Sequence, residues 1–278
     1  MSHLFQAVRE VLMELLVDPK YLGAEPGFLL ALHTWGRSLS LHPHIHCLIT
    51  DGGLAGDEWR TPRGSCFLPA RVVMAKFRGK FLWMIRHALE KGELILPQGE
   101  RPARFQSLLN KLGRIKWNVN LRERYGHGAG VVQYLARYVR GGPLRNSQLI
   151  DLSSAQVKFR YFAHNDGAAR VMTLTPEVFM LRYLQHVPEA GRPTVRHYGL
   201  YAHTKTAALN RARPLFQQPP LSPPSPITWQ AYYQQRHPAA GVHTCAVCGV
   251  PLVSSHRLAR SRGPPLRGSE RPRTPAHA

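Results

Sequence analysis

The chain has 278 residues, enough for one large domain or two small ones, and its 44% hydrophobic content is typical of a globular protein rather than a disordered or fibrous one. Lysine and arginine number 37 against 16 acidic residues, a formal net charge of +21 that predicts a polyanionic partner. No apolar run approaches the ~20 residues of a membrane-spanning helix. Four cysteines exclude a disulfide framework and favour a reducing compartment, the cytoplasm.

The first part of the chain alternates helical and strand patterns. The apolar positions that follow Ser2 recur on one helical face, which predicts a first helix. Ser2 can cap this helix, since serine is a preferred N-cap residue. Residues 28–35 and 44–50 are short apolar runs bounded by turn residues, which is typical of strands. Residues 70–91 have the spacing of a long amphipathic helix with basic exposed positions. We therefore expect a helix, two adjacent strands and a second helix.

A strongly basic region follows, from Arg101 to Arg145, and we expect it to be helical. It holds ten basic residues against one acidic residue, Glu123. Further along, residues 157–161 alternate apolar and polar side chains, and a turn, His164-Asn-Asp-Gly167, leads from them to residues 170–174. This pattern predicts a β-hairpin.

A last helix of the folded part is predicted just after the hairpin. Thr175 can cap it, Pro176 suits its first position, and it should end near His186. Two adjacent strands, helices, a hairpin and a helix favour an α+β fold over a parallel α/β fold. We expect a central antiparallel sheet flanked by helices.

Composition divides the chain into four parts. We assign residues 1–212 to the folded core. Residues 213–236 are expected to form a linker, since six prolines fall between Pro214 and Pro226. Residues 237–256 hold a candidate zinc knuckle. Residues 257–278 contain six arginines and four prolines with almost nothing to bury, so we expect a disordered basic tail.

The sharpest local feature is the segment Leu41-His-Pro-His-Ile-His46. His44 and His46 are two residues apart on a predicted strand, so both imidazoles should point to the same face. That spacing suits chelation of one metal ion by neutral imidazoles, and the alternative is a polar strand face in contact with water. His42 extends the face, and His33 can supply a third ligand if the two strands pair. The grouping of four histidines favours a metal site over a polar strand face that is merely in contact with water.

A second feature is a pair of tyrosines, Tyr134 and Tyr138, four residues apart in a helical context and therefore on one helical face. A phenol can attack phosphorus and form a covalent aryl phosphate, and Arg137 and Arg140 would hold a phosphate backbone nearby. Taken alone, the pair is better explained by aromatic packing on the core. Together with a metal-binding strand face, it suits metal-assisted DNA strand transfer.

These two features resemble those of a known family. His44-Ile-His46 resembles the histidine–hydrophobic–histidine motif of the HUH endonucleases, and Tyr134-Leu-Ala-Arg-Tyr138 resembles the tyrosine pair of their two-tyrosine rolling-circle transposases, the group named after insertion sequence ninety-one. Further phrases follow in the family's order, and the combination is specific: Leu32-His-Thr-Trp-Gly36, His42-Pro-His-Ile-His-Cys-Leu48, Gly52-Gly-Leu54 and Arg196-His-Tyr-Gly-Leu200.

The resemblance implies a nuclease core and a mechanism. In this family the histidine pair holds a divalent cation, Mg²⁺ or Mn²⁺, which polarises the scissile phosphate. One tyrosine becomes joined to the DNA 5′ end, and the second allows another cleavage or strand transfer without release. Carried over to this chain, Tyr134 and Tyr138 are the nucleophiles. His33 is the first choice for the third metal ligand, and Gln133 is the second.

The chain departs from the family pattern before its core. The family carries a cysteine-rich zinc ribbon there, whereas few residues precede the first predicted strand here, which favours a truncated copy. The sequence leaves three hypotheses. The first is a nucleoid-associated transposase, an enzyme that cuts and rejoins single-stranded DNA at element ends and targets. The second is a plasmid replication initiator or relaxase of the same nuclease class, and the third is a non-catalytic DNA-binding remnant.

Two further sites are predicted from residue type. Cys245-Ala-Val-Cys248 has the spacing of a Zn²⁺ knuckle, and an unmetallated surface turn explains it equally well. In the basic region, six side chains are expected to follow the phosphate backbone of DNA. They are Arg104, Lys111, Arg114, Lys116, Arg122 and Arg124.

Overall fold

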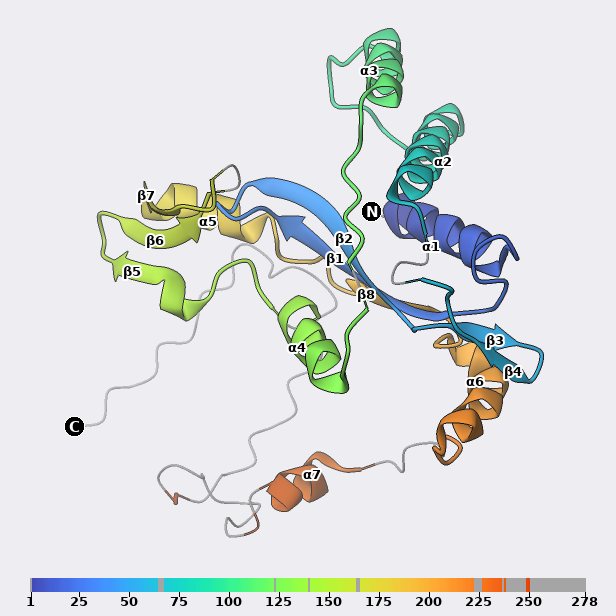
Figure 1. Cartoon of the computed structure of the whole chain (residues 1–278). Helices are drawn as coiled ribbons and strands as arrows, with labels where there is room; N and C mark the ends of the chain where they lie inside the picture. The colour runs from blue at the N-terminus through green and yellow to red at the C-terminus, as the bar shows by residue number, and fades with distance from the viewer. Residues whose placement is uncertain are drawn as a thin grey trace. The chain divides into compact units, whose positions relative to one another are not determined.

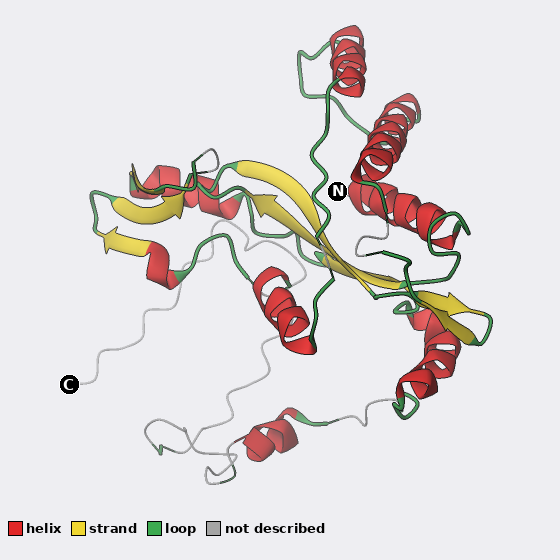
Figure 2. Cartoon of the chain, viewed as in Figure 1, coloured by secondary structure: helices red, strands yellow, loops and turns green. Residues whose placement is uncertain are grey.

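The structure is a computed structural model that describes residues 2–64, 68–122, 124–139, 141–163, 166–222, 227–236, 238 and 249–250. The chain divides into two units, Met1–Leu221 and Ser222–Ala278. Figures 1 and 2 show the arrangement of helices and strands. The elements of the first unit are, in chain order, α1 (Ser2–Val17), β1 (Gly27–Trp35), β2 (Leu41–Ile49), β3 (Gly53–Ala55), β4 (Glu58–Arg60), α2 (Ala70–Glu90), α3 (Pro102–Arg114), α4 (Gly128–Tyr138), β5 (Leu149–Leu152), β6 (Val157–Phe162), β7 (Ala169–Leu174), α5 (Pro176–Leu184), β8 (Val195–Gly199) and α6 (Thr206–Ala212).

A three-stranded antiparallel sheet in the order β2-β1-β8 lies at the centre of this unit. The two adjacent strands predicted from the sequence are β1 and β2, and they pair with Leu30 opposite Cys47 and His33 opposite His44. The third strand, β8, pairs with the edge of β1 that faces away from β2, although more than 150 residues separate β1 and β8 in sequence. The α+β class with antiparallel sheets flanked by helices is confirmed.

The two faces of this sheet have different roles. Alternate residues of β1 and β2 point to one face and form the main hydrophobic core with α1, as expected for a strand with a period of two. The buried strand residues there include Phe28, Leu30 and Leu32, and the predicted first helix contributes Phe5, Leu15 and Leu16. The remaining residues of β1 and β2, which include the histidines, point to the opposite face.

The predicted hairpin and the helix after it are confirmed. Strand β6 pairs with β7, with Val157 opposite Leu174, and β5 adds a third strand to this second sheet. Thr175 caps α5, because its hydroxyl accepts a hydrogen bond from the amide of Val178, and Pro176 occupies the first helical position. Strands β3, β4 and β5 were not predicted, since they are too short to show a clear period.

The basic region is helical only in part. Helices α3 and α4 are separated by a connection without regular structure, whereas the sequence pattern suggested one helical region from Arg101 to Arg145. Val119 and Leu121 of this connection are two residues apart, and both pack against the main core. Partial burial of both side chains favours this irregular path over a continuous helix.

A glycine fixes the junction between β8 and β1. Gly199 has a φ of +59°, and a Cβ at this position would overlap the carbonyl oxygen of Pro26. The next residue, Leu200, donates its amide to the same carbonyl. Only glycine combines this left-handed conformation with such a close backbone approach.

In the second unit, α7 (Trp229–Arg236) lies within the segment expected to be a linker. The prolines between Pro214 and Pro226 precede it and do not interrupt it. The candidate zinc knuckle with Cys245 and Cys248, and the predicted tail at residues 257–278, lie outside the described residues. No helix in the described part of the chain is long and apolar enough to cross a membrane.

Candidate active site

Three histidines gather on the open face of the central sheet. Nitrogen atoms of His33, His44 and His46 all lie within 4.8 Å of one another. The ring of His33 is 5.5 Å from that of His44 and 4.5 Å from that of His46, centroid to centroid. The antiparallel register creates this cluster, because it places His33 directly opposite His44. The expectation that strand pairing brings His33 to the other two is confirmed.

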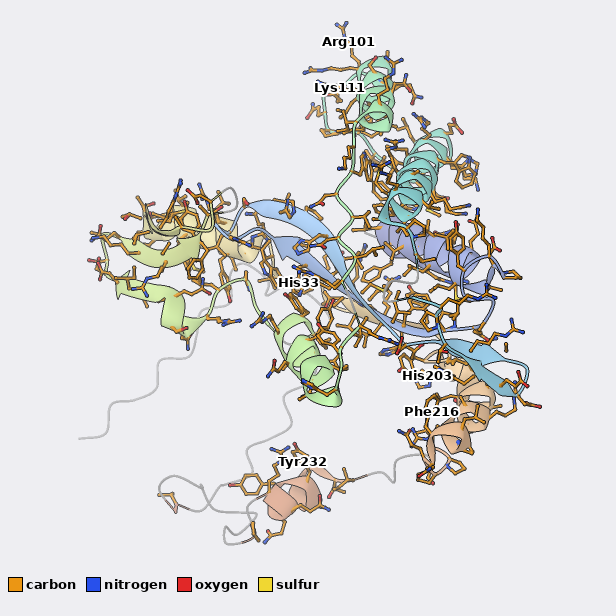
Figure 3. The ribbon with its side chains drawn as sticks, in the orientation of Figure 1. His33, Arg101, Lys111, His203, Phe216 and Tyr232 are labelled. Atoms are coloured by element: carbon orange, nitrogen blue, oxygen red, sulfur yellow. The ribbon has the colours of Figure 1, made fainter. Side chains whose placement is uncertain are left out.

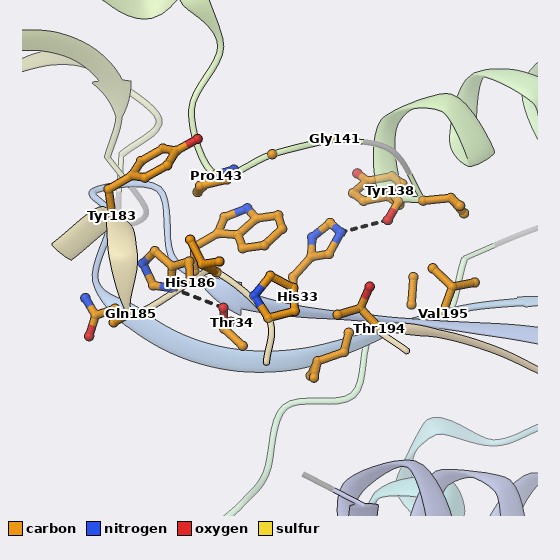
Figure 4. A pocket seen from close by; sticks show the side chains of 17 residues that line it. His33, Thr34, Tyr138, Gly141, Pro143, Tyr183, Gln185, His186, Thr194 and Val195 are labelled. Atoms are coloured by element: carbon orange, nitrogen blue, oxygen red, sulfur yellow. Dashed lines mark hydrogen bonds between the residues drawn. The ribbon is translucent and has the colours of Figure 1, made fainter. Parts of the chain in front are cut away.

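Hydrogen bonds to carbonyl oxygens set the tautomers of two of these rings. His44 donates from Nδ1 to the carbonyl oxygen of His42 at 2.7 Å, which leaves the Nε2 lone pair free to bind a metal ion. His33 donates from Nε2 to the carbonyl oxygen of Tyr138 at 2.8 Å, so its Nδ1 carries the lone pair. Figure 4 shows this second bond, which joins the cluster to the end of α4.

The three imidazoles are neutral at pH 7. Burial lowers the pKa of His33 and of His44 below the ordinary value of 6.5. Burial, together with the positive charge that His33 and His44 carry when protonated, lowers the pKa of His46 to about 4. Neutral imidazole is the form that binds metal ions, so this cluster is ready to accept one without first losing protons.

The donor set indicates which metal fits. Among the described residues, this histidine trio is the one group of His, Cys, Asp and Glu side chains close enough to hold an ion. Three imidazoles suit first-row divalent ions, whereas Mg²⁺ prefers oxygen ligands. The cluster therefore fits a divalent cation, with Mn²⁺ better matched than Mg²⁺ to its nitrogen atoms.

Helix α4 lies against the histidine face and presents both tyrosines to it. Its first turn is capped by His127, whose Nδ1 accepts from the amide of Gly130. The ring of Tyr138 is 4.0 Å from the ring of His46, and the ring of Tyr134 is 6.2 Å from it. The two tyrosine rings are 4.6 Å apart. Helical spacing of four residues thus places both phenols beside the cluster.

The environment of Tyr134 keeps its phenol protonated. Its hydroxyl donates to the carbonyl oxygen of Cys47 at 3.4 Å. Burial is the main cause that raises the pKa of Tyr134 well above its usual range. Burial likewise raises the pKa of the Cys47 thiol, which packs toward the core and stays neutral. Tyr134 therefore presents a neutral hydroxyl, rather than a phenolate, beside the histidine cluster.

Trp35 supports the cluster from the same strand. Its indole stacks on the ring of His33, with centroids 4.3 Å apart and an angle of 19° between the planes. Residues two apart on a strand share a face, so the sequence places the two side chains together, although we did not predict this contact. The stacking restricts the orientation of the His33 imidazole.

A fourth histidine, His186, has a structural position that sequence reasoning missed. It is 5% exposed, and its Nε2 donates to the carbonyl oxygen of Leu39 at 3.2 Å, while Nδ1 accepts from the hydroxyl of Thr34 at 3.1 Å. Leu39 lies in the turn between β1 and β2 and has a φ of +59°, unusual for a side chain of this kind. The sequence places His186 near the predicted end of a helix, and no local pattern there indicates that its side chain is buried and hydrogen-bonded.

Other predicted site residues lie outside this cluster. Gln133 and Arg137 are exposed on α4. Arg114 and Lys116 are exposed at the end of α3, where Arg78 of α2 donates to the intervening Ile115 carbonyl. Figure 3 shows Lys111 of α3 well separated from His33. Arg140 lies outside the described residues.

Comparisons with known proteins identify the family of the chain. A family model described as "Putative transposase", Y2_Tnp, matches residues 27–208. The chain is 33% identical over 243 residues to "Putative transposase y4qJ" of Sinorhizobium fredii (strain NBRC 101917 / NGR234), covering 84% of this chain and 60% of that protein. It is 29% identical over 197 residues to "Transposase for insertion sequence element IS801" of Pseudomonas savastanoi pv. phaseolicola, covering 68% of this chain and 46% of that protein. The chain thus spans about half the length of the curated relatives it matches. No solved structure matches it.

Proposed function

The chain belongs to the family of two-tyrosine transposases named after insertion sequence ninety-one, and on that premise we propose that it cleaves and rejoins single-stranded DNA through covalent 5′-phosphotyrosine intermediates. The observation that carries the proposal is the position of Tyr134 and Tyr138 beside the three-histidine cluster. The substrates are single strands at the ends of a mobile element and at its target.

His33, His44 and His46 would hold the divalent cation, which supplies Lewis-acid polarisation of the scissile phosphate when bound. The hydroxyl of one tyrosine attacks the phosphorus. A bond forms between the phenolic oxygen and phosphorus, and the bond from phosphorus to the 3′ oxygen breaks. The phenolic proton is lost and the departing 3′ oxygen gains one, so the strand is left with a free 3′ hydroxyl. The phosphotyrosine keeps the energy of the broken phosphodiester for rejoining.

The presence of two candidate nucleophiles favours a strand-transfer reaction rather than the cutting of one strand alone. The tyrosine rings are 4.6 Å apart, so a second attack can take place while the first strand stays covalently attached. A replication initiator or relaxase of the same nuclease class shares the histidine motif and the chemistry, and the spacing of the two tyrosines favours the transposase. The clustered neutral histidines and the two adjacent phenols also favour an active nuclease over a non-catalytic remnant.

Positive charge supports the choice of DNA as substrate. The net charge is +21, and Arg137 is exposed on α4 between the two tyrosines in sequence. Arginine forms strong bidentate hydrogen bonds with phosphate oxygens, so Arg137 can hold the strand near the nucleophiles. Arg114 and Lys116 would follow a more distant part of the strand.

The test is a covalent adduct assay with labelled single-stranded DNA and Mn²⁺. Attack by tyrosine leaves the 3′ fragment on the protein, so a 3′ label should migrate with the protein on a denaturing gel and a 5′ label should not. The double variant Tyr134→Phe/Tyr138→Phe should give no adduct, whereas the control Tyr161→Phe on β6 should give the normal amount. An undiminished band from the double variant would exclude the two-tyrosine mechanism.

A further inference from the structure

A cavity of about 260 Å³ lies next to the histidine cluster, since His33 is among the residues that line it. Its walls come from β1, from the chain that follows α4, from the end of α5 and from the start of β8. Figure 4 shows Tyr183 and His186 toward one end of it and Tyr138 toward the other. His33 and Tyr138 belong both to the lining of this cavity and to the candidate active site, so the cavity borders that site.

The described lining of the cavity is rich in aromatic rings. Trp35 and Tyr183 contribute aromatic rings, and Thr194 and Gln185 contribute a few polar groups. No lysine or arginine occurs among the described residues that line it, although the chain has an excess of both. Among these described residues, a flat heterocycle with hydrogen-bonding edges would find stacking surfaces and polar partners, which makes them better suited to a base than to a phosphate group.

We propose that this cavity binds one unpaired nucleobase of the DNA strand, next to the scissile phosphate. The inference rests on the proposed function, and it adds a base-binding site to the phosphate-binding one. Its volume is below the ~300–1,000 Å³ of pockets for drug-sized ligands, which suits a single base rather than a longer stretch of strand.

The walls are held in place before any DNA arrives. His186, just after α5, joins two of these walls because its Nδ1 accepts a hydrogen bond from Thr34 on β1. Its Nε2 also donates to the carbonyl of Leu39 in the β1–β2 turn. Trp35 is fixed by stacking on His33 at one side and lies 6.1 Å from the His186 ring at the other. A site of fixed shape loses little conformational entropy on binding, so it can distinguish bases by size and by edge pattern.

The position of the cavity gives this binding a consequence for cleavage. The carbonyl of Tyr138 bonds to His33, and both residues line the cavity. A base seated there would bring its neighbouring phosphate toward the histidines and the nucleophile. The cavity would therefore contribute sequence preference at the nucleotide beside the cut.

The test compares binding of two strands of equal length, an oligothymidylate and an abasic strand with the same number of phosphates. Binding is measured by fluorescence anisotropy without added metal, so that no cleavage occurs. Because stacking of a base on an aromatic side chain is worth roughly 5- to 150-fold in affinity, the wild-type chain should prefer the oligothymidylate by roughly tenfold or more. Tyr183→Leu should remove most of that preference and leave abasic binding unchanged.

The matched control is Tyr161→Leu. Tyr161 and Tyr183 are both half-buried and both lie against a phenylalanine. The ring of Tyr161 is 6.5 Å from that of Phe159, and the ring of Tyr183 is 5.8 Å from that of Phe179. Unlike Tyr183, Tyr161 does not line the cavity. Tyr161→Leu should keep the preference for bases. The second variant, Thr194→Val, removes a hydroxyl with little change in volume and should lower the preference several-fold.

A photocrosslinking experiment gives an independent readout. An oligothymidylate with one 5-iodouracil should crosslink to the peptide that contains Trp35 or Tyr183. An unchanged base preference in both Tyr183→Leu and Thr194→Val, or crosslinks confined to other peptides, would overturn the proposal. Neither result affects the covalent adduct assay, which depends on Tyr134 and Tyr138, so failure of this inference is distinguishable from failure of the proposed function.

Discussion

The ring of Tyr138 lies over the imidazole of His46, with centroids 4.0 Å apart and an angle of 30° between the planes, whereas the ring of Tyr134 stands 6.2 Å away at 74°. The two tyrosines are therefore not equivalent in their relation to the histidine cluster. Tyr134 is further engaged by the carbonyl of Cys47, and burial raises its pKa. Under the proposed mechanism we therefore expect Tyr138, whose ring is the nearer of the two to His46, to make the first attack on the scissile phosphate.

The asymmetry predicts different effects of the two phenylalanine variants. Tyr138→Phe should slow formation of the first adduct by roughly 10²-fold, because a nucleophile displaced by an ångström or more reacts that much more slowly. Tyr134→Phe should leave the first adduct near wild-type levels and abolish transfer to a second strand. Single-turnover adduct formation on 3′-labelled DNA measures both. Equal rates in the two variants would contradict the proposed order.

Metal binding should stabilise the chain through the histidine cluster. At a Mn²⁺ concentration of 100 times the dissociation constant, the free energy of unfolding should rise by about 2.7 kcal/mol. The double variant His44→Ala/His46→Ala should lose this increase and keep its affinity for single-stranded DNA. His42→Ala is the matched control, since His42 is an exposed histidine whose ring lies 5.3 Å from that of His44 but which does not belong to the three-histidine cluster. Thermal unfolding with and without Mn²⁺ is the measurement.

Without metal, the stability of the chain should depend on pH in a defined window. The pKa of His46 is lowered to about 4 in the folded state, against an unfolded value of 6.5, and those of His33 and His44 are lowered too. Between these values the unfolded chain binds more protons than the folded chain, so the free energy of unfolding rises with pH. Stability should thus be lost as pH falls from 6.5 toward 4.

His46→Ala provides the comparison for this pH dependence. The variant lacks the group with the most lowered pKa of the three, so its stability should change less over the same window. Urea unfolding at several pH values gives the two slopes. A wild-type slope that is no steeper than that of the variant would show that His46 does not carry the effect.

The buried bonds of His186 should matter for stability rather than for chemistry. His186→Ala would leave the Leu39 carbonyl and the Thr34 hydroxyl without their partner, at a cost of roughly 1–3 kcal/mol in the free energy of unfolding. His203→Ala, at an exposed position before α6, should change it by less than about 0.5 kcal/mol. Denaturant titration of both variants measures these two changes. A His186→Ala variant as stable as His203→Ala would show that the buried bonds of His186 are dispensable.

The basic end of α3 should contribute to DNA binding through charge alone. Affinity for single-stranded DNA should fall linearly with salt on a log–log plot, with a slope of roughly −0.7 for each neutralised phosphate. Arg114→Gln/Lys116→Gln should make the slope shallower by about 1.4, the sum of two such contacts. Arg192→Gln is the control, because Arg192 is exposed and already paired with Glu189. An unchanged slope in the double variant would remove this surface from the DNA path.

Local periodicity determined much of this protein. His44 and His46 share a face because side chains alternate along a strand, and Tyr134 and Tyr138 share one because a helix repeats after about four residues. Thr175 and Pro176 marked the start of α5 by the same kind of short-range chemistry. These features depend on neighbours in sequence, so the residues alone fix them.

Tertiary structure decided everything that depends on pairing between distant segments. The register of β1 with β2 places His33 opposite His44, and the docking of α4 brings Tyr138 to His46 across about 90 residues of sequence. The connection after α3 is irregular because Val119 and Leu121 are partly buried against the core. His186 and the cavity beside His33 exist only where four elements meet. Such contacts depend on burial and hydrogen bonding between residues that are far apart in sequence. The periodic patterns that reveal helices and strands do not indicate which distant segments will meet.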